Sequence, residues 1–76
     1  MIEYMPIESP LFDLVGYDVK SKILEVHFVD SGYTFAYEDI PEDEFDALLD
    51  AKSKEKYLQY IIDSYEGYRV NTKQSR

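Results

Sequence analysis

Large apolar residues alternate with smaller or polar ones across the middle of the chain, in the pattern of a β-hairpin. They recur at every second position on both sides of a short break: Leu24, Val26 and Phe28, then Tyr33, Phe35 and Tyr37. Successive side chains of a strand point to opposite faces, so each run predicts one strand with one apolar face. Between the runs, Gly32 provides a residue that adopts positive φ without strain, as a tight turn requires.

The length of the turn decides which way the aromatic side chains point. With a turn of two or four residues, Phe28 lies opposite Phe35. Val26 then faces Tyr37, and one face of the hairpin carries all the large apolar groups. With a three-residue turn, His27 faces Phe35 instead, and the two apolar stripes go to opposite faces. We favour the first register because it leaves one apolar face to receive helices, which makes Phe35 and Tyr37 core residues.

Two helices are predicted after the hairpin. Pro41 suits the first helical position, and the three acidic residues after it favour the positive end of the helix dipole. Ser53 is a good N-cap for a second helix, and Gly67 is a suitable stop. Each helix has one apolar stripe at helical spacing. The stripes consist of Phe45, Leu48 and Leu49 in the first helix, and of Leu58, Ile61, Ile62 and Tyr65 in the second.

The remaining segments complete the predicted fold. Residues 11–18 form a first strand by composition, with Gly16 as a bulge or a point of close approach. Residues 1–10 are interpreted as a leader that is flexible or lies extended along the sheet, and residues 69–76 as a polar tail. The sequence therefore predicts a single α+β domain over residues 11–68, in which a three-stranded antiparallel β-meander is packed on one face by two short C-terminal α-helices.

The charge of the chain is strongly negative and unevenly distributed. The net charge of the 76 residues is -8, and cysteine is absent. Residues 1–50 hold 13 acidic residues and two lysines, a balance of -11, whereas residues 51–76 hold six basic and three acidic residues, a balance of +3. Such acidity disfavours casual binding to nucleic acid or to anionic membranes. Without a leader-like segment or an apolar run of about 18 residues, neither a signal peptide nor a membrane span is predicted, and cytoplasmic residence is expected.

Short motifs occur along the chain in an order and spacing that resemble the KTSC domain. They are Val15-Gly16-Tyr17-Asp18, Leu24-Glu25-Val26, Phe35-Ala36-Tyr37, Ile40-Pro41, Phe45, Leu48-Leu49, Ala51, and Ser53-Lys54 with Tyr57. This short domain is named after its place at the C-terminus of some lysyl-tRNA synthetases, and it also occurs as a stand-alone bacterial protein, the form that this chain resembles. The resemblance covers roughly residues 11–68 and places the family's central aromatic motif at Phe35 and Tyr37.

The resemblance implies no established activity, and it suggests RNA binding through the synthetase context and the central Tyr-x-Tyr motif. This chain has Phe35 in place of the first tyrosine of that motif. Asp63 stands where the family pattern has a basic residue. These departures weigh against a nucleic-acid role more than against the fold.

RNA binding would use the C-terminal third, where basic residues and tyrosines are interleaved. Single-strand binders combine a basic groove with aromatic side chains on which bases stack. The candidate binding residues are Lys52, Lys54, Lys56, Tyr57, Tyr60, Tyr68 and Arg69. Against this hypothesis, the three lysines cannot all share one helical face, and tyrosines at helical spacing more often pack within or around a core.

Residues with catalytic or metal-binding chemistry are sparse. His27 is the sole histidine and, by alternation, shares the polar face of its strand with Glu25, which is typical of a solvated histidine. The acidic residues between positions 38 and 44 lack the spacing of a calcium loop and suit a helix start instead. The sequence therefore predicts no enzyme, no metal or other cofactor, and no small-molecule ligand.

Aromatic residues are abundant, since the chain holds eight tyrosines and four phenylalanines. Tyrosine is enriched at interfaces, and a three-stranded meander leaves an edge that accepts another strand. Tyr4, Tyr60 and Tyr68 lie outside the core stripes, so their gathering on one exposed patch would favour an interface. The prediction is a non-catalytic module that binds a protein partner or itself as a homo-oligomer, with RNA, such as tRNA, as the alternative ligand.

Overall fold

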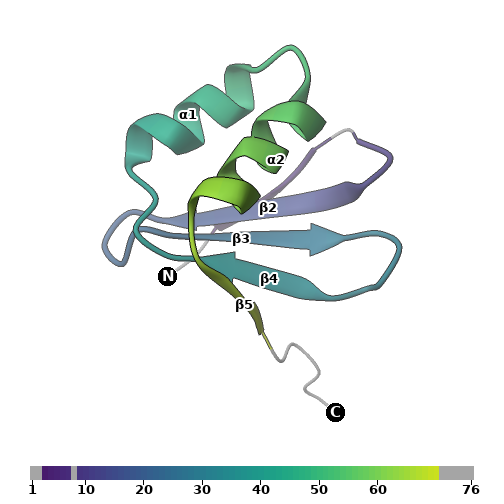
Figure 1. The fold of residues 1–76 in the computed structure, drawn as a ribbon, viewed down its shortest axis with the longest axis horizontal. Coiled ribbons are helices and arrows are strands. Elements are labelled where there is room, and N and C mark those ends of the chain that lie inside the picture. Colours follow the sequence, from purple (N-terminus) through teal and green to yellow (C-terminus); the bar gives the residue numbers. More distant parts are fainter. Residues whose placement is uncertain (1–2, 8, 71–76) are drawn as a thin grey trace.

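An antiparallel sheet and two helices make up the fold in the computed structural model, which describes residues 3–7 and 9–70 (Figure 1). The strands are β1 (Glu3–Pro6), β2 (Phe12–Asp18), β3 (Ile23–Phe28), β4 (Thr34–Tyr37) and β5 (Gly67–Val70). The helices are α1 (Glu42–Asp50) and α2 (Lys54–Ser64). The strands lie side by side in the order β1-β2-β3-β4-β5. The predicted α+β class with two helices is confirmed.

The sheet has five strands, so the predicted number of three was wrong. β1 pairs with β2 at one edge, and β5 pairs with β4 at the other. Both strands have only four residues without a sustained apolar alternation, and they form because the edges of the meander offer unpaired main-chain groups. β1 lies in the segment interpreted as a leader, and residues 69 and 70 of β5 in the segment interpreted as a tail. Residues 1, 2 and 8 of that leader and 71–76 of that tail lie outside the described residues.

The hairpin of β3 and β4 has the predicted face but not the predicted pairs. Val26 lies opposite Phe35, and Leu24 lies opposite Tyr37, so the cross-strand pairs are shifted by two residues from the favoured register. The shift arises because the four-residue loop covers residues 29–32, so the turn is centred one residue earlier than the favoured register requires. The amide of Phe28 closes this loop by donating to the Tyr33 carbonyl at 2.9 Å. An even loop length still places both apolar stripes on one face.

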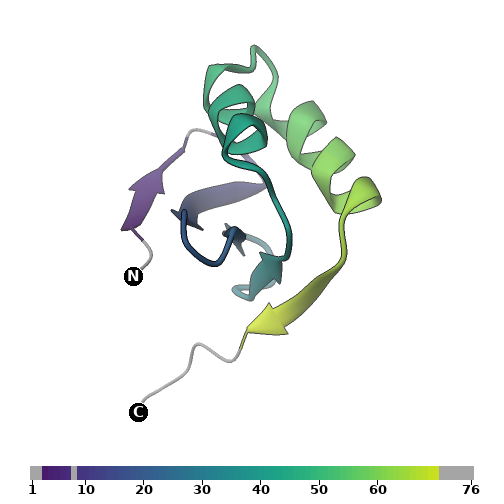
Figure 2. The same cartoon turned by 90° about the vertical axis from the view of Figure 1, so that its left-hand side faces the viewer.

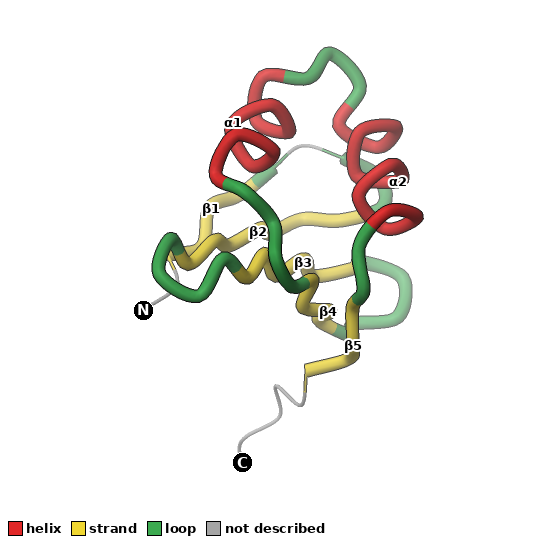
Figure 3. Tube along the Cα trace, turned by 60° about the vertical axis from the view of Figure 1, so that its left-hand side comes forward, coloured by secondary structure: helices red, strands yellow, loops and turns green. Residues whose placement is uncertain are grey.

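The core lies between the sheet and the two helices, which cover one face of the strands (Figure 3). Tyr37 is 6% exposed and Phe35 packs against the core, as expected for both residues. The helical stripes contribute as predicted: Leu48, Leu58 and Ile61 are buried, and Phe45, Leu49, Ile62 and Tyr65 pack against the core. No helix among the described residues is long and apolar enough to cross a membrane.

The second helix begins where the sequence predicts, and the first begins one residue later. Pro41 is the N-cap of α1, with an extended backbone, rather than its first helical residue, and three acidic residues fill the first turn. The side chain of Ser53 accepts a hydrogen bond from the Lys56 amide at 3.3 Å, which confirms the predicted N-cap of α2.

The glycines predicted as a bulge and as a helix stop have other roles. The β-bulge lies between Phe12 and Leu14 rather than at Gly16, so of the two roles predicted for Gly16 only the point of close approach is left. Gly67 is not the residue that ends α2, since that helix ends at Ser64 and Gly67 begins β5. A Cβ atom at Gly67 would lie 2.4 Å from Cδ1 of Tyr37, so close packing against this ring requires the glycine.

Tyr17 joins the sheet to the start of α1. Its hydroxyl donates a hydrogen bond to the carbonyl oxygen of Ile40, and its ring stacks on that of Phe45 at 4.9 Å between centroids. Burial first, and then the nearby carboxylates of Glu42 and Asp46, raise the pKa of Tyr17. Tyr17 therefore positions the segment through which the chain leaves the sheet for the helices.

We expect Tyr17→Phe to lower the free energy of unfolding by about 1–2 kcal/mol, because it leaves the carbonyl of the fully buried Ile40 without its side-chain donor. Urea unfolding followed by circular dichroism measures the change. The matched control is Tyr33→Phe, because the Tyr33 side chain is 47% exposed. Equal stability of the two variants would contradict the assigned role of Tyr17.

Candidate functional site

The candidate binding residues of the C-terminal third are divided between two regions of the fold. Lys52 precedes α2, four of the candidates lie on α2, and Tyr68 and Arg69 lie on β5. A helix of 11 residues is about 16 Å long, so its full length separates the lysines at its start from the strand that follows its end. The predicted candidates therefore do not form one continuous basic surface.

The tyrosines of α2 converge on an acidic residue that the sequence analysis did not single out. Tyr57 donates its hydroxyl to Oε1 of Glu44, and Tyr60 and Tyr65 donate to Oε2 at 3.1 and 3.0 Å. The rings of Tyr57 and Tyr60 are 5.5 Å apart and tilted by 53°. We call these four residues the Glu44 cluster. It joins α1 to α2 and to the residue that follows α2.

The hydrogen bonds of the Glu44 cluster shift the pKa of each of its members. The Tyr57 hydroxyl contributes most to a lowered pKa of Glu44, helped by Tyr65 and Tyr60 and opposed by desolvation. In return, the carboxylate raises the pKa of Tyr57 to about 12. The pKa of Tyr60 rises mainly through its hydrogen bond to Glu44, and that of Tyr65 mainly through burial. An ionised carboxylate among these rings repels phosphate, so the cluster is a poor platform for RNA bases.

The lysines near the start of α2 differ in their surroundings. The ammonium of Lys54 donates to the carbonyl oxygen of Ala51 at 2.9 Å, at the carbonyl end of α1. Lys52 and Lys56 are exposed. The C-terminal end of α1 favours a cation, so Lys54 has a structural partner there. Lys52 and Lys56 are accessible to a ligand.

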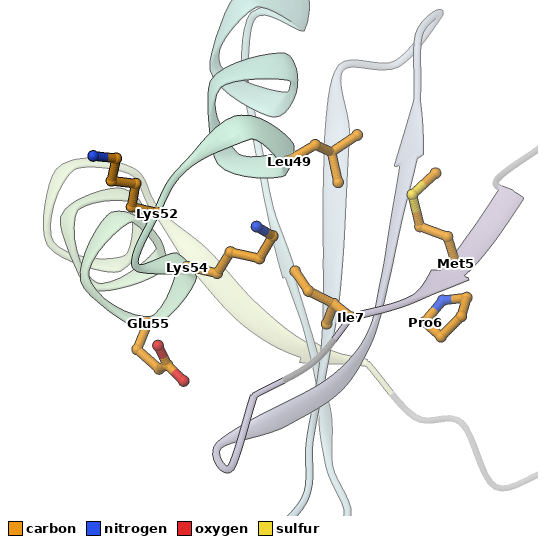
Figure 4. A pocket seen from close by; sticks show the side chains of 7 residues that line it. All are labelled: Met5, Pro6, Ile7, Leu49, Lys52, Lys54 and Glu55. Atoms are coloured by element: carbon orange, nitrogen blue, oxygen red, sulfur yellow. The ribbon is translucent and has the colours of Figure 1, made fainter.

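A hollow of about 560 Å³ lies between β1 and the turn that joins the helices (Figure 4). Its lining residues are Met5, Pro6, Ile7, Leu49, Lys52, Lys54 and Glu55. Lys52 extends away from the apolar side chains in Figure 4, and Lys54 already donates to a carbonyl. The hollow therefore lacks a set of polar groups aimed at one point, as a small-molecule site requires.

The face of the sheet opposite the helices is covered by none of the described elements (Figure 2). We call it the open face. One cross-strand row on it consists of Tyr4, Gly16, Glu25, Ala36 and Tyr68. The hydroxyl of Tyr4 donates to Oε1 of Glu25, so its side chain spans the position of Gly16 between them. Tyr4 is 54% exposed and Tyr68 is 46% exposed, at the two ends of the row.

A second row on the open face contains the histidine. Leu14, His27, Thr34 and Val70 are neighbours in this row, and Leu14 is exposed. Nδ1 of His27 lies 2.7 Å from Oδ1 of Asp13, the residue at the bulge. The sequence predicted a solvated strand histidine, and it did not predict that His27 has an acidic partner on the neighbouring strand.

The three tyrosines proposed as a test of an interface do not gather at one place. Tyr4 and Tyr68 share the open face, whereas Tyr60 belongs to the Glu44 cluster on the helices. Another aromatic contact escaped the sequence analysis: the guanidinium of Arg69 lies 4.4 Å from the centroid of the Tyr33 ring. No local pattern could have indicated it, because only the pairing of β4 with β5 brings these residues together.

Comparison with known proteins identifies relatives of the whole domain. The family model described as KTSC domain matches residues 8–65. A protein of Tsukamurella paurometabola is 35% identical over 57 residues, which cover 75% of this chain and 84% of that protein. The crystal structure of a KTSC domain protein from Yersinia pestis has a TM-score of 0.85 at 24% identity, over 92% of this chain and 99% of that one. At this identity the structural likeness shows a shared fold.

Proposed function

The chain belongs to the KTSC domain family, as the order of its motifs predicted, and from that premise we propose that it is a small non-catalytic module that binds protein through the open face of its sheet. One observation carries the proposal. Tyr4, Leu14 and Tyr68 are exposed together on the face that the helices leave uncovered. Tyrosines combine large apolar area with a polar group and few rotatable bonds, which suits them to interfaces.

The charge on this face favours a neutral or basic protein over a polyanion. Glu25 lies in the middle of the first row, and Asp13 lies beside the second. The whole chain carries -8. A partner with a lysine or arginine could approach Glu25 between the two tyrosines, whereas a phosphate backbone would be repelled.

Affinity capture with quantitative mass spectrometry tests this proposal. We expect a protein partner that the wild type retains and that the double variant Tyr4→Ser/Tyr68→Ser loses. The matched control is Tyr60→Ser, which replaces a tyrosine of similar exposure, 48%, on the helical side. Binding through the open face would be contradicted if the Tyr60→Ser control lost the partner to the same extent. It would also be contradicted if the double variant retained every protein that the wild type retains.

RNA binding is the second candidate, and one observation favours it. The guanidinium of Arg69 is stacked on the half-exposed ring of Tyr33, which provides a cation beside an exposed aromatic ring. An amide chemical-shift titration with short RNAs and intact tRNA at low salt tests it.

For RNA binding we expect shifts that weaken steeply with salt and that are lost in Lys52→Glu/Lys56→Glu/Arg69→Glu. Lys54 is kept because its ammonium bonds to Ala51. Absence of shifts at low salt would exclude RNA as the ligand.

A further inference from the structure

The two edges of the sheet differ in how they present the main chain. At β1, the amide of Ile7 donates to the carbonyl of Asp13 at 3.1 Å. In an antiparallel pair, hydrogen-bonded and outward-facing residues alternate, so Tyr4 and Pro6 direct their main-chain groups away from β2. Pro6 has no N–H group. The β1 edge therefore offers a single outward donor within this strand, and a proline on an edge opposes strand addition.

At β5 the edge carries no such block. The amide of Glu38 donates to the carbonyl of Glu66 at 3.1 Å, in line with the register of β4 and β5. By the same alternation, Tyr68 and Val70 bond to β4, while Gly67 and Arg69 direct N–H and C=O groups outward. Gly67, Tyr68 and Arg69 are all exposed. This edge thus presents two donors and two acceptors to solvent.

We propose that β5 pairs with β5 of a second copy of the chain, antiparallel and about a two-fold axis at Tyr68, so that the two five-stranded sheets become continuous. The proposal goes beyond the proposed function, because its contact is the outer edge of β5 and not the open face. The residues that direct main-chain groups outward are placed symmetrically about Tyr68. Gly67 of one copy therefore faces Arg69 of the other, and both outward pairs form their main-chain hydrogen bonds.

The side chains favour this register over its neighbours. An axis at Arg69 would place two arginines directly opposite each other, which is unfavourable, whereas the axis at Tyr68 places each Arg69 beside a glycine. Tyr68 and its equivalent then form a non-hydrogen-bonded pair, with Cα atoms about 4.5 Å apart on the open face. Such an aromatic pair stabilises a sheet.

Electrostatics give the association a distinctive dependence on salt. Each copy carries -8, so two copies repel at long range, although Arg69 makes the β5 edge itself locally basic. Added salt screens this repulsion and is expected to strengthen the dimer. Binding of RNA by the same strand would weaken with salt instead.

Sedimentation equilibrium from micromolar to millimolar protein tests the proposal. For wild type we expect a reversible dimer that tightens with salt. Arg69→Pro removes one outward N–H group and copies the block that Pro6 provides at β1, so we expect about tenfold or greater weakening. The control is Arg69→Gln, which removes the charge but keeps the N–H group and is expected to dimerise.

A second measurement does not depend on how well the proline variant folds. The chain has no cysteine, so Tyr68→Cys introduces a single thiol at the proposed axis. The expected Cα separation suits a disulfide, and mild oxidation should link two copies much faster than it links Tyr60→Cys. Wild type that stays monomeric at millimolar concentration, or a dimer unaffected by Arg69→Pro and without preferred cross-linking at position 68, would overturn the proposal.

The same experiments separate this inference from the proposed function. A monomeric chain that still loses a protein partner in Tyr4→Ser/Tyr68→Ser would overturn the dimer and leave protein binding in place. A monomeric chain with no such partner would overturn both.

Discussion

Replacement of Gly67 by alanine is expected to lower the free energy of unfolding by about 2–3 kcal/mol, near the upper end of what overpacking costs. The new Cβ would lie 2.4 Å from both Cδ1 and Cε1 of Tyr37, and 3.1 Å from the carbonyl oxygen of Ala36. Tyr37 is only 6% exposed, so its ring is part of the packed core. Either β5 must move away from β4 or the core must deform.

Thermal and urea unfolding of Gly67→Ala measure this cost, and two further variants identify its cause. Gly32→Ala tests backbone strain alone, because Gly32 has φ +77° and a Cβ atom there would meet nothing within 4 Å beyond its chain neighbours. In the Tyr37→Leu background the ring is gone, so Gly67→Ala should cost distinctly less than in wild type. Equal costs in the two backgrounds would show that the ring is not the obstacle.

Replacement of Glu44 by glutamine is expected to lower the free energy of unfolding by about 2 kcal/mol at neutral pH. Hydrogen bonds to a charged group are stronger than those between neutral groups, and the carboxylate of Glu44 accepts three of them, from Tyr57, Tyr60 and Tyr65. Partial exposure of the cluster to water limits the loss. The amide keeps only one acceptor oxygen, so it cannot replace the carboxylate.

The difference between wild type and Glu44→Gln should depend on pH at both ends of the scale. The pKa of Glu44 is lowered on folding, so its contribution is present above the unfolded value of 4.5 and is lost as pH falls through the folded pKa. The pKa of Tyr57 is raised from 10.0 to about 12, so its contribution is present below pH 10 and is lost as pH rises toward 12. We expect the largest difference between these two limits.

Urea unfolding of both proteins across this pH range measures the effect. The matched control is Asp43→Asn, which removes an acidic residue from the same first turn of α1. A loss that is equal in the two variants would mean that Glu44 acts only through the helix dipole, and the Glu44 cluster would then have no special role.

The strands and helices that the sequence predicted are those whose signal is local. Composition identified β2, alternation over several residues identified β3 and β4, and stripes at helical spacing identified α1 and α2. Ser53 as the N-cap of α2 and Gly32 as the positive-φ residue of the hairpin depend only on their immediate neighbours, and both were correct. The motif order also identified the family.

The features that the sequence did not predict depend on contacts between distant residues. Whether residues 67–70 form a strand depends on the free edge of β4, not on their own composition. Gly67 was interpreted as a helix stop because glycine often follows a helix. Its contact with the ring of Tyr37 could not be predicted, since Tyr37 is remote in sequence. The candidate binding residues formed one basic stretch in the sequence, but α2 and β5 place them in separate regions.

The sequence by itself determined three of the strands, both helices and which of their faces are apolar, because side-chain periodicity and composition are properties of each segment alone. Only the tertiary structure decided that the sheet has two more strands, that Glu44 binds the tyrosines of α2, and that the open face displays Tyr4 and Tyr68. These features arise from the register in which distant segments pair. Register is set by the packing of the whole domain, because every pairing must satisfy both its main-chain hydrogen bonds and the shared core.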